Sequence, residues 1–245
     1  MYKVRDFYNY IDSFAPFDTQ EEWDNSGFLI GDIEAQVRKV AVMLDITEKS
    51  LEKAIGIGAD LIVSHHPIIF SPMKKLMSDS IQYKAVKAGI NIISAHTSFD
   101  NNGVNLALER ALLLKNASSH PDIPMIRIGE IPNTDVYIFL NKVKKVLDCK
   151  SIRYNRVYDD IKTVAVCGGS GGSFVKDLSG VDAFITGDAD HHDFLDAESQ
   201  DILLIAAGHF ETERIAMSYM TEKLSGEFKN AEIILIDEEN PIKYI

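Results

Sequence analysis

Cysteine and tryptophan are scarce in this chain of 245 residues, and basic residues are outnumbered by acidic ones. It has two cysteines and one tryptophan, and 37 acidic residues outnumber 25 basic ones, which gives a formal net charge of −12. Cys149 and Cys167 form no C-x-x-C pair and no zinc-knuckle spacing, which argues against a thiolate metal site and for reduced thiols. The acidic balance argues against nucleic acid and anionic membranes as partners, because no basic patch offsets it.

Long apolar runs are missing as well. No segment has the roughly 18 uninterrupted apolar residues of a membrane-spanning helix, and the first six residues lack the apolar stretch of a signal peptide. Together with the reduced thiols, this predicts a cytoplasmic protein. The chain is 46% hydrophobic and 25% charged, the balance of an ordinary globular protein of one large domain or two small ones.

Short apolar runs alternate with helical patterns. Val40–Leu44 and Leu61–Ser64 have the pattern of buried strands, and Glu48–Gly58 between them has that of a helix. This alternation predicts an α/β fold with a largely parallel sheet. The segment Ser118–Pro132 is rich in proline and breaks the pattern, which indicates a domain junction. Beyond it, strands are expected at Ile152–Tyr158, Thr163–Cys167, Ala183–Thr186, Ile202–Ala206 and Glu232–Asp237.

Two motifs place metal-ligating side chains directly after predicted strands. Ser-His-His-Pro contains His65 and His66, and His-Thr-Ser-Phe-Asp contains His96 and Asp100. Ligand sites of open α/β sheets lie beyond the carboxyl ends of their strands, so these side chains are expected at one sheet edge. The alternatives are a loop with two partly exposed histidines, and an aspartate that caps the following helix.

A third motif, Gly-His-Phe-Glu-Thr-Glu, follows the strand Ile202–Ala206 and opens a helix. His209 and Glu213 are four residues apart and therefore share one helical face, as two ligands of one metal do. The alternative is a His–Glu pair on a solvated helix surface.

The three motifs together are stronger evidence than each one alone, because all three would lie at the carboxyl ends of strands. Mixed nitrogen and oxygen ligands suit Zn, Mn, Fe, Co or Ni. Five protein ligands exceed the three of an open catalytic zinc and predict two ions roughly 3.5–4 Å apart. The predicted metal ligands are His65, His66, Asp100, His209 and Glu213.

Weaker signals lie in three turn-rich segments. The glycines of Cys-Gly-Gly-Ser-Gly-Gly, namely Gly168, Gly169 and Gly171, are candidates to bind a substrate phosphate, or else they form a tight structural turn. The only tryptophan, Trp23, begins a Trp-Asp-Asn-Ser-Gly turn and is interpreted as a packing anchor. The polar loop after Thr186-Gly187-Asp188 either lines a cleft or starts the next helix.

Taken in order, Trp-Asp-Asn-x-Gly, Ser-His-His-Pro, His-Thr-x-x-Asp, the glycine-rich turn, Thr-Gly-Asp and Gly-His-Phe-Glu-Thr-Glu resemble the GTP cyclohydrolase I type 2 family, also called the NGG-interacting-factor-three family. The chain resembles its compact form, without an inserted domain. The resemblance implies two α/β domains with mostly parallel or mixed sheets, with the metal site in the cleft between them. We expect residues 1–122 plus 218–245 in the first domain and residues 123–217 in the second.

The same resemblance implies a centre of two divalent ions. Glu213 would bridge both ions, His66 and Asp100 would hold one, and His65 and His209 the other. It also implies a hexameric toroid of identical subunits.

The expected function is that of a hydrolase in which a metal-bound hydroxide attacks a cyclic amidine, the imidazole ring of GTP, or a phosphorylated small molecule. His96 is the candidate proton shuttle. The alternatives are a metal-binding or metal-delivery protein without catalysis, and a ring-shaped interaction scaffold.

Overall fold

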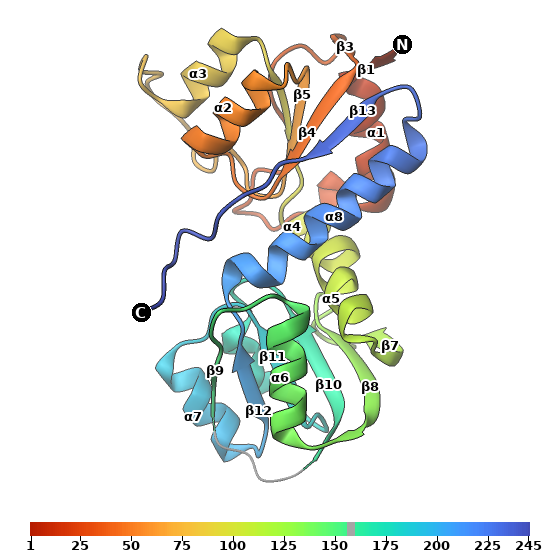
Figure 1. Ribbon diagram of the computed structural model, residues 1–245, viewed down its shortest axis with the longest axis vertical. Helices are drawn as coiled ribbons and strands as arrows, with labels where there is room; N and C mark the ends of the chain where they lie inside the picture. Colours follow the sequence, from red (N-terminus) through yellow and green to blue (C-terminus); the bar gives the residue numbers. More distant parts are fainter. Residues whose placement is uncertain (156–159) are drawn as a thin grey trace. The chain divides into compact units, whose positions relative to one another are not determined.

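The computed structural model describes residues 1–155 and 160–245, and the chain forms two compact units (Figure 1). Unit 1 comprises Met1–Asn102 and Met217–Glu239, and unit 2 comprises Gly103–Ala216 and Asn240–Ile245. Each unit holds a mixed sheet with helices, so the predicted fold class is confirmed. None of the helices in these described residues is both long enough and apolar enough to span a bilayer.

The chain enters unit 2 at 102/103 and not at the predicted 122/123, whereas its return to unit 1 at 216/217 is one residue from the predicted 217/218. Ser118–Pro132, expected to be a junction, instead contains the end of β7 (Lys115–Ser119) and most of β8 (Arg127–Thr134), which pair antiparallel inside unit 2. Pro132 is tolerated in β8 because the register with the next strand shifts at that point. The chain passes from unit 1 to unit 2 within a helical run instead: α4 (Thr97–Phe99), a π-helical turn η2 (Asp100–Val104) and α5 (Asn105–Leu112).

The sheet of unit 1 has five strands, four of them parallel. In sheet order they are β13 (Glu232–Leu235), β4 (Lys39–Met43), β5 (Leu61–Ser64), β6 (Asn91–Ser94) and the antiparallel β2 (Gly27–Ile30). The strands β4, β5 and β6 are almost wholly buried, as expected of parallel strands covered on both faces. A separate antiparallel pair joins β1 (Tyr2–Lys3) to β3 (Gln36–Val37).

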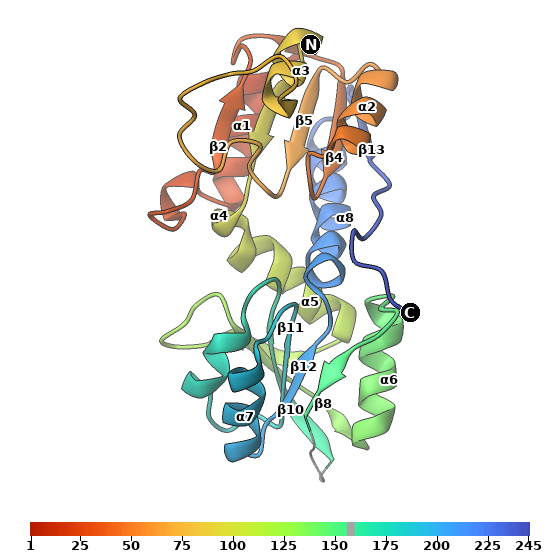
Figure 2. The same cartoon turned by 90° about the vertical axis from the view of Figure 1, so that its left-hand side faces the viewer.

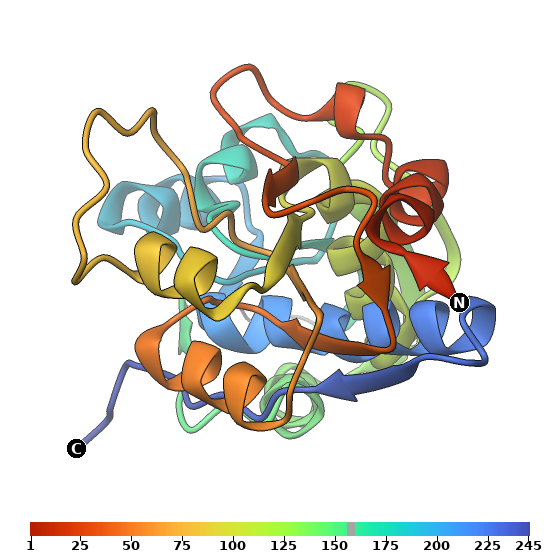
Figure 3. The ribbon, with the colours of Figure 1, turned by 90° about the horizontal axis from the view of Figure 1, so that it is seen from above.

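Helices cover both faces of the unit 1 sheet (Figure 3). On one face, α2 (Glu48–Gly56) and α3 (Ile81–Ala88) bury small apolar residues against the side chains of β4, β5 and β6. On the other, α1 (Val4–Phe14) places Phe7 in a stacked contact with Phe228, at 3.8 Å between ring centroids. A short 3-10 helix η1 (Phe17–Thr19) follows α1.

The sheet of unit 2 has six strands. In sheet order they are β7, β8, β10 (Ile161–Cys167), β11 (Ala183–Thr186), β12 (Leu203–Ala206) and β9 (Arg153–Tyr154). The central strands β10, β11 and β12 are parallel, whereas β8 and β9 run antiparallel to their neighbours. The strand predicted at Ile152–Tyr158 is thus present as β9, and its part from residue 156 on lies outside the described residues.

The helices of unit 2 flank this sheet (Figure 2). α6 (Val136–Val146) lies on one side of β10–β12, and α7 (His191–Ser199) on the other, together with the 3-10 helix η3 (Gly172–Asp177). Asp135 caps α6 by accepting the amide hydrogens of Tyr137 and Ile138. The long helix α8 (His209–Glu227) begins in unit 2, directly after β12, and its later turns belong to unit 1.

Candidate metal-binding residues in the two units

Unit 1 carries four of the predicted site residues at one edge of its sheet. His65 and His66 follow β5 directly, His96 follows β6, and Asp100 begins the π-helical turn. Because β4, β5 and β6 are parallel, their carboxyl ends meet at the same edge. The placement of these histidines at strand ends is therefore as the sequence predicts.

The three histidines of this edge lie close together. Their ring centroids are 4.9 Å apart for His65 and His66, 5.1 Å for His65 and His96, and 5.3 Å for His66 and His96. Each offers a nitrogen that lies within 4.8 Å of the other two, so the group could hold a metal ion. Asp100 joins them, because its Oδ1 lies 3.5 Å from Nε2 of His65.

Each of these histidines has an oxygen acceptor at its Nδ1. The acceptor of His65 is the carbonyl oxygen of Ala95 at 2.8 Å, that of His66 is Asp45 Oδ1 at 2.8 Å, and that of His96 is Asp24 Oδ1 at 2.8 Å. A carbonyl or carboxylate oxygen can only accept, so Nδ1 is the donor in each bond, and in the neutral imidazole the lone pair is on Nε2. Histidines that bind metal ions are oriented by the same kind of hydrogen bond.

Asp24 is the most completely satisfied of these acceptors. Its side chain is fully buried and receives hydrogen bonds from His96, the Thr97 amide and hydroxyl, and the Ser26 hydroxyl. Burial alone would raise the pKa of Asp24, but the hydrogen bonds from His96 and Thr97 and the charge of His96 outweigh it and hold the pKa well below its usual range. Asp24 is therefore a carboxylate at any physiological pH.

Asp100 does not cap a helix, although a cap was one interpretation of its motif. It lies in αR conformation at the end of α4, and the helical run continues through the π-helical turn that it begins. An N-cap residue has a non-helical backbone, and its side chain accepts a hydrogen bond from a backbone amide in the first turn of the helix that follows. Single π-helical turns inside α-helices often occur at functional sites, and this one begins at the carboxylate that lies beside His65.

In unit 2, His209 and Glu213 occupy the first two turns of α8. His209 Nε2 lies 3.0 Å from Glu213 Oε2, and His209 Nδ1 lies 2.7 Å from Asp188 Oδ2. Hydrogen bonding to Glu213 raises the pKa of His209 to about 9 against the effect of burial, and Asp188 adds to the rise. Because Glu213 is buried, this pair is not the solvated surface pair of the alternative interpretation.

The glycine-rich turn after β10 packs against this pair. Gly169 has φ +65°, and a Cβ there would overlap Oε1 of Glu213. The amides of Gly168, Gly169 and Gly171 donate to Asn105 Oδ1, Thr212 Oγ1 and Thr186 Oγ1, respectively. These contacts support the structural-turn alternative, because the amides are already used inside the unit. Binding of a substrate by this turn stays a prediction. A phosphate bound there would need hydrogen-bond donors other than these three amides.

Sequence reasoning missed the acceptors that orient the histidines. Asp24 and Asp188 lie in motifs interpreted as packing and polar-loop segments, and Asp45 was not considered. One signal was available: Asp45 and Asp188 lie two residues after the ends of β4 and β11, at the carboxyl ends of parallel strands, as the histidines do. A carboxylate in that position is a candidate partner for a neighbouring imidazole.

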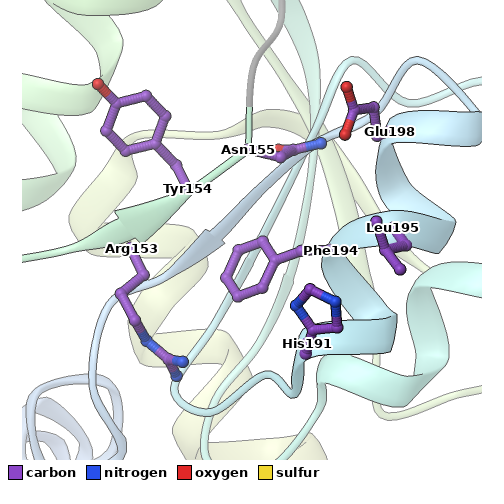
Figure 4. A pocket seen from close by; sticks show the side chains of 7 residues that line it. All are labelled: Arg153, Tyr154, Asn155, His191, Phe194, Leu195 and Glu198. Atoms are coloured by element: carbon purple, nitrogen blue, oxygen red, sulfur yellow. The ribbon is translucent and has the colours of Figure 1, made fainter.

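A cavity of about 280 Å³ in unit 2 lies apart from these residues. Arg153 of β9 extends beside Phe194 and His191 of α7, whereas the Tyr154 ring points away from them (Figure 4). The Arg153 guanidinium lies 5.6 Å from the centre of the Phe194 ring and donates to the carbonyl oxygen of Ala189. The described lining contains none of the predicted ligands.

Comparisons with known proteins agree with the motifs. The family model Duf34/NIF3 (NGG1p interacting factor 3) matches residues 2–241. The chain is 33% identical to a GTP cyclohydrolase 1 type 2 homolog of Campylobacter jejuni over 99% of both chains. It is also 33% identical to such a homolog of Clostridium acetobutylicum, over 99% of this chain and 98% of that one.

A solved structure shows the same fold. The crystal structure of a hypothetical protein from Staphylococcus aureus covers 99% of both chains with a TM-score of 0.92 and 28% sequence identity. The resemblance that the six motifs predict is thereby confirmed, and the chain belongs to the Duf34/NIF3 family.

Proposed function

We propose that this protein is a hydrolase that depends on two divalent metal ions held by His65, His66, Asp100, His209 and Glu213. In this proposal Glu213 is shared by both ions, His66 and Asp100 hold one, and His65 and His209 hold the other.

The observation that carries the proposal is the oxygen acceptor at Nδ1 of every proposed histidine ligand. His65, His66 and His209 donate to Ala95, Asp45 and Asp188, respectively. Each of these bonds makes Nδ1 the donor and orients the ring so that Nε2 is the ligand atom for a metal ion. The nitrogen and carboxylate donors fit Zn, Mn, Fe, Co or Ni.

The bound ions would activate water at neutral pH and polarise the bond under attack. His96 acts as the proton carrier in this proposal. Its Nδ1 is held by Asp24, which leaves Nε2 to accept or donate a proton within reach of His65 and His66. Asp24 positions the His96 ring, as a carboxylate positions a catalytic imidazole.

The proposed substrate class is a nucleotide, with GTP as the first candidate. It rests on the relatives that are named GTP cyclohydrolase 1 type 2 homologs. We also propose a homohexameric ring and a cytoplasmic location, which sedimentation and cell fractionation test.

The test is reconstitution. Protein stripped of metal is loaded with Zn, Mn, Fe, Co or Ni in turn, its metal content is measured, and GTP is followed for ring opening by absorbance and release of formate. We expect two ions per chain and turnover that His66→Ala abolishes and His96→Gln reduces about 100-fold.

The outcomes separate the alternatives. Two tightly bound ions without turnover of GTP or of a panel of nucleotides and phosphoesters would favour the metal-binding or metal-delivery protein. A chain that keeps no divalent metal after reconstitution would refute the central proposal.

A further inference from the structure

Trp23 and Phe70 are large aromatic residues exposed beside the histidine cluster of unit 1. The Trp23 side chain is 57% exposed and that of Phe70 is 50% exposed. The sequence interpretation of Trp23 as a packing anchor is therefore wrong, because an anchor would be buried. Exposed apolar groups that gather at a candidate site often mark a place where a ligand or partner binds.

The two aromatic rings form a group with His96. The ring centroids of Trp23 and Phe70 are 5.8 Å apart with a tilt of 45°. The His96 ring lies 5.8 Å from Trp23 and 6.2 Å from Phe70, in edge-to-face contact with both. The centroid distance leaves no room for a third ring between Trp23 and Phe70, so a ligand would stack on an exposed face.

Hydrogen bonds hold the backbone on both sides of this group. Asn25 Nδ2 donates to the carbonyl oxygen of Ile69 at 2.6 Å, which ties the turn of Trp23 to the segment of Phe70. Gln82 Nε2 donates to the carbonyl oxygen of Ile68 at 2.7 Å. The rings are thus exposed on anchored backbone, an arrangement that reduces the entropy lost when a ligand binds.

Positive charge for an anionic ring compound is available after Phe70. Phe70 begins an exposed stretch, Phe70–Asp79, that includes Lys74 and Lys75 as well as Asp79. Although Glu21 and Glu22 precede Trp23, the two neighbouring exposed lysines supply positive charge for a phosphate group.

We propose that Trp23 and Phe70 form a stacking platform for the planar heteroaromatic ring of the substrate, a purine or a related fused ring. The platform holds that ring beside His96, and Lys74 and Lys75 attract its phosphate. Stacking suits recognition of the substrate ring because every such ring has a π-face. His96, the proposed proton carrier, then lies at the edge of the substrate ring. This inference rests on the proposed function and names the part of the substrate that unit 1 recognises.

The experiment is calorimetric titration of the metal-loaded full-length protein with GMP, inosine monophosphate and a pterin. Ribose 5-phosphate serves as the probe without a ring. Trp23→Leu and Phe70→Leu keep apolar volume and remove the ring, Trp23→Phe keeps a ring, and Leu76→Ala removes exposed apolar area from the same segment. Metal content and sedimentation are measured for each variant.

We expect both leucine variants to weaken binding of the ring compounds about 5- to 100-fold. Trp23→Phe should restore most of the loss, and Leu76→Ala should bind as the parent does. Equal affinity in all variants, no binding of any ring compound, or equally tight binding of ribose 5-phosphate would overturn the proposal.

Two further outcomes distinguish failure of the stacking platform from failure of the proposed hydrolase function. If the leucine variants dissociate the assembly and leave ligand affinity unchanged, the rings form an interface between copies of the chain and the platform is refuted. If the protein binds GMP through these rings but has no metal-dependent turnover, the platform stands and the hydrolase proposal fails.

Discussion

The two units present their candidate ligands in different ways. In unit 1, histidines extend from loops at the ends of parallel strands, and their carboxylate partners come from other segments of the chain, as Asp24 and Asp45 do. In unit 2, His209 and Glu213 lie on one helix, and a glycine turn packs directly against them. Unit 1 therefore surrounds its ligands with polar and aromatic side chains, whereas unit 2 fixes them by close packing.

This difference assigns different tasks to the two units. Unit 1 has groups beyond the proposed ligands, including His96, Trp23 and Phe70, which suit proton transfer and substrate recognition. The neighbours of His209 and Glu213 include the glycine turn, Ser170 and Asp188, which suit rigid holding of a metal ion. Substitutions in the two units should accordingly affect different measurements.

The largest effect is expected from Glu213 in unit 2. Because Glu213 is proposed to bind both ions, Glu213→Gln should lose both, whereas His66→Ala should lose one. Metal-to-protein ratios after dialysis measure this, and Glu222→Gln on an exposed position of the same helix is the control. Equal losses in the Glu213 and His66 variants would refute the shared role of Glu213.

The next largest effects are expected from Asp188 and Asp24, the two carboxylates that orient His209 and His96. Asp188 holds a proposed metal ligand, so Asp188→Asn should weaken metal affinity by about 10- to 100-fold. Asp24 holds the proton carrier, so Asp24→Asn should keep both ions, lower turnover and change its pH profile. Asp196→Asn, an exposed position on α7, controls for loss of charge. Loss of metal in the Asp24 variant would show that His96 is a ligand and not a proton carrier.

The histidine positions could be predicted from sequence because parallel strands place their carboxyl ends at one edge. The runs before His65 and His209 are short, apolar and easily identified as strands, so their neighbours could be placed without coordinates. The resemblance to a known family then supplied the grouping of five ligands, which strand order alone could not.

The partners of the histidines could not be predicted because they depend on pairings between distant segments. The antiparallel pairing of β2 with β6 brings Asp24 next to His96, and no local sequence pattern predicts this pairing. The β7–β8 pair was missed for a related reason, since proline and glycine in Ser118–Pro132 indicate a linker locally. The register between β8 and β10 shifts beside Pro132, which lets the strand accommodate this proline.

A smaller effect tests the close packing of unit 2. Gly169→Ala combines the strain of φ +65° with overlap against Glu213, whereas Gly180→Ala has φ +68° and open space around its Cβ. Strain alone should cost about 1 kcal/mol of unfolding free energy at Gly180, and Gly169 should cost about 1–3 kcal/mol more. Urea denaturation of the metal-free variants gives both values. If the two variants lose equal stability, the turn does not depend on contact with Glu213.

The smallest effect is the pH dependence that His209 gives to the metal-free protein. Its pKa is raised from 6.5 to about 9, chiefly by Glu213, so the folded state holds this proton more tightly than the unfolded chain does. The stabilisation is full below pH 6.5 and is lost as pH rises through about 9. Half of Asp188 and a third of His209 are exposed, so solvent screens part of it.

Urea denaturation of metal-free protein at pH 6, 8 and 10 measures this contribution, with Glu213→Gln as the variant that removes it. Stability of the parent should fall across this range by more than that of the variant. Metal should suppress the difference, because a metal ion needs the neutral imidazole and takes the place of the proton. Parallel curves for parent and variant without metal would show that the His209–Glu213 pair does not stabilise unit 2, and its close packing would then serve metal binding alone.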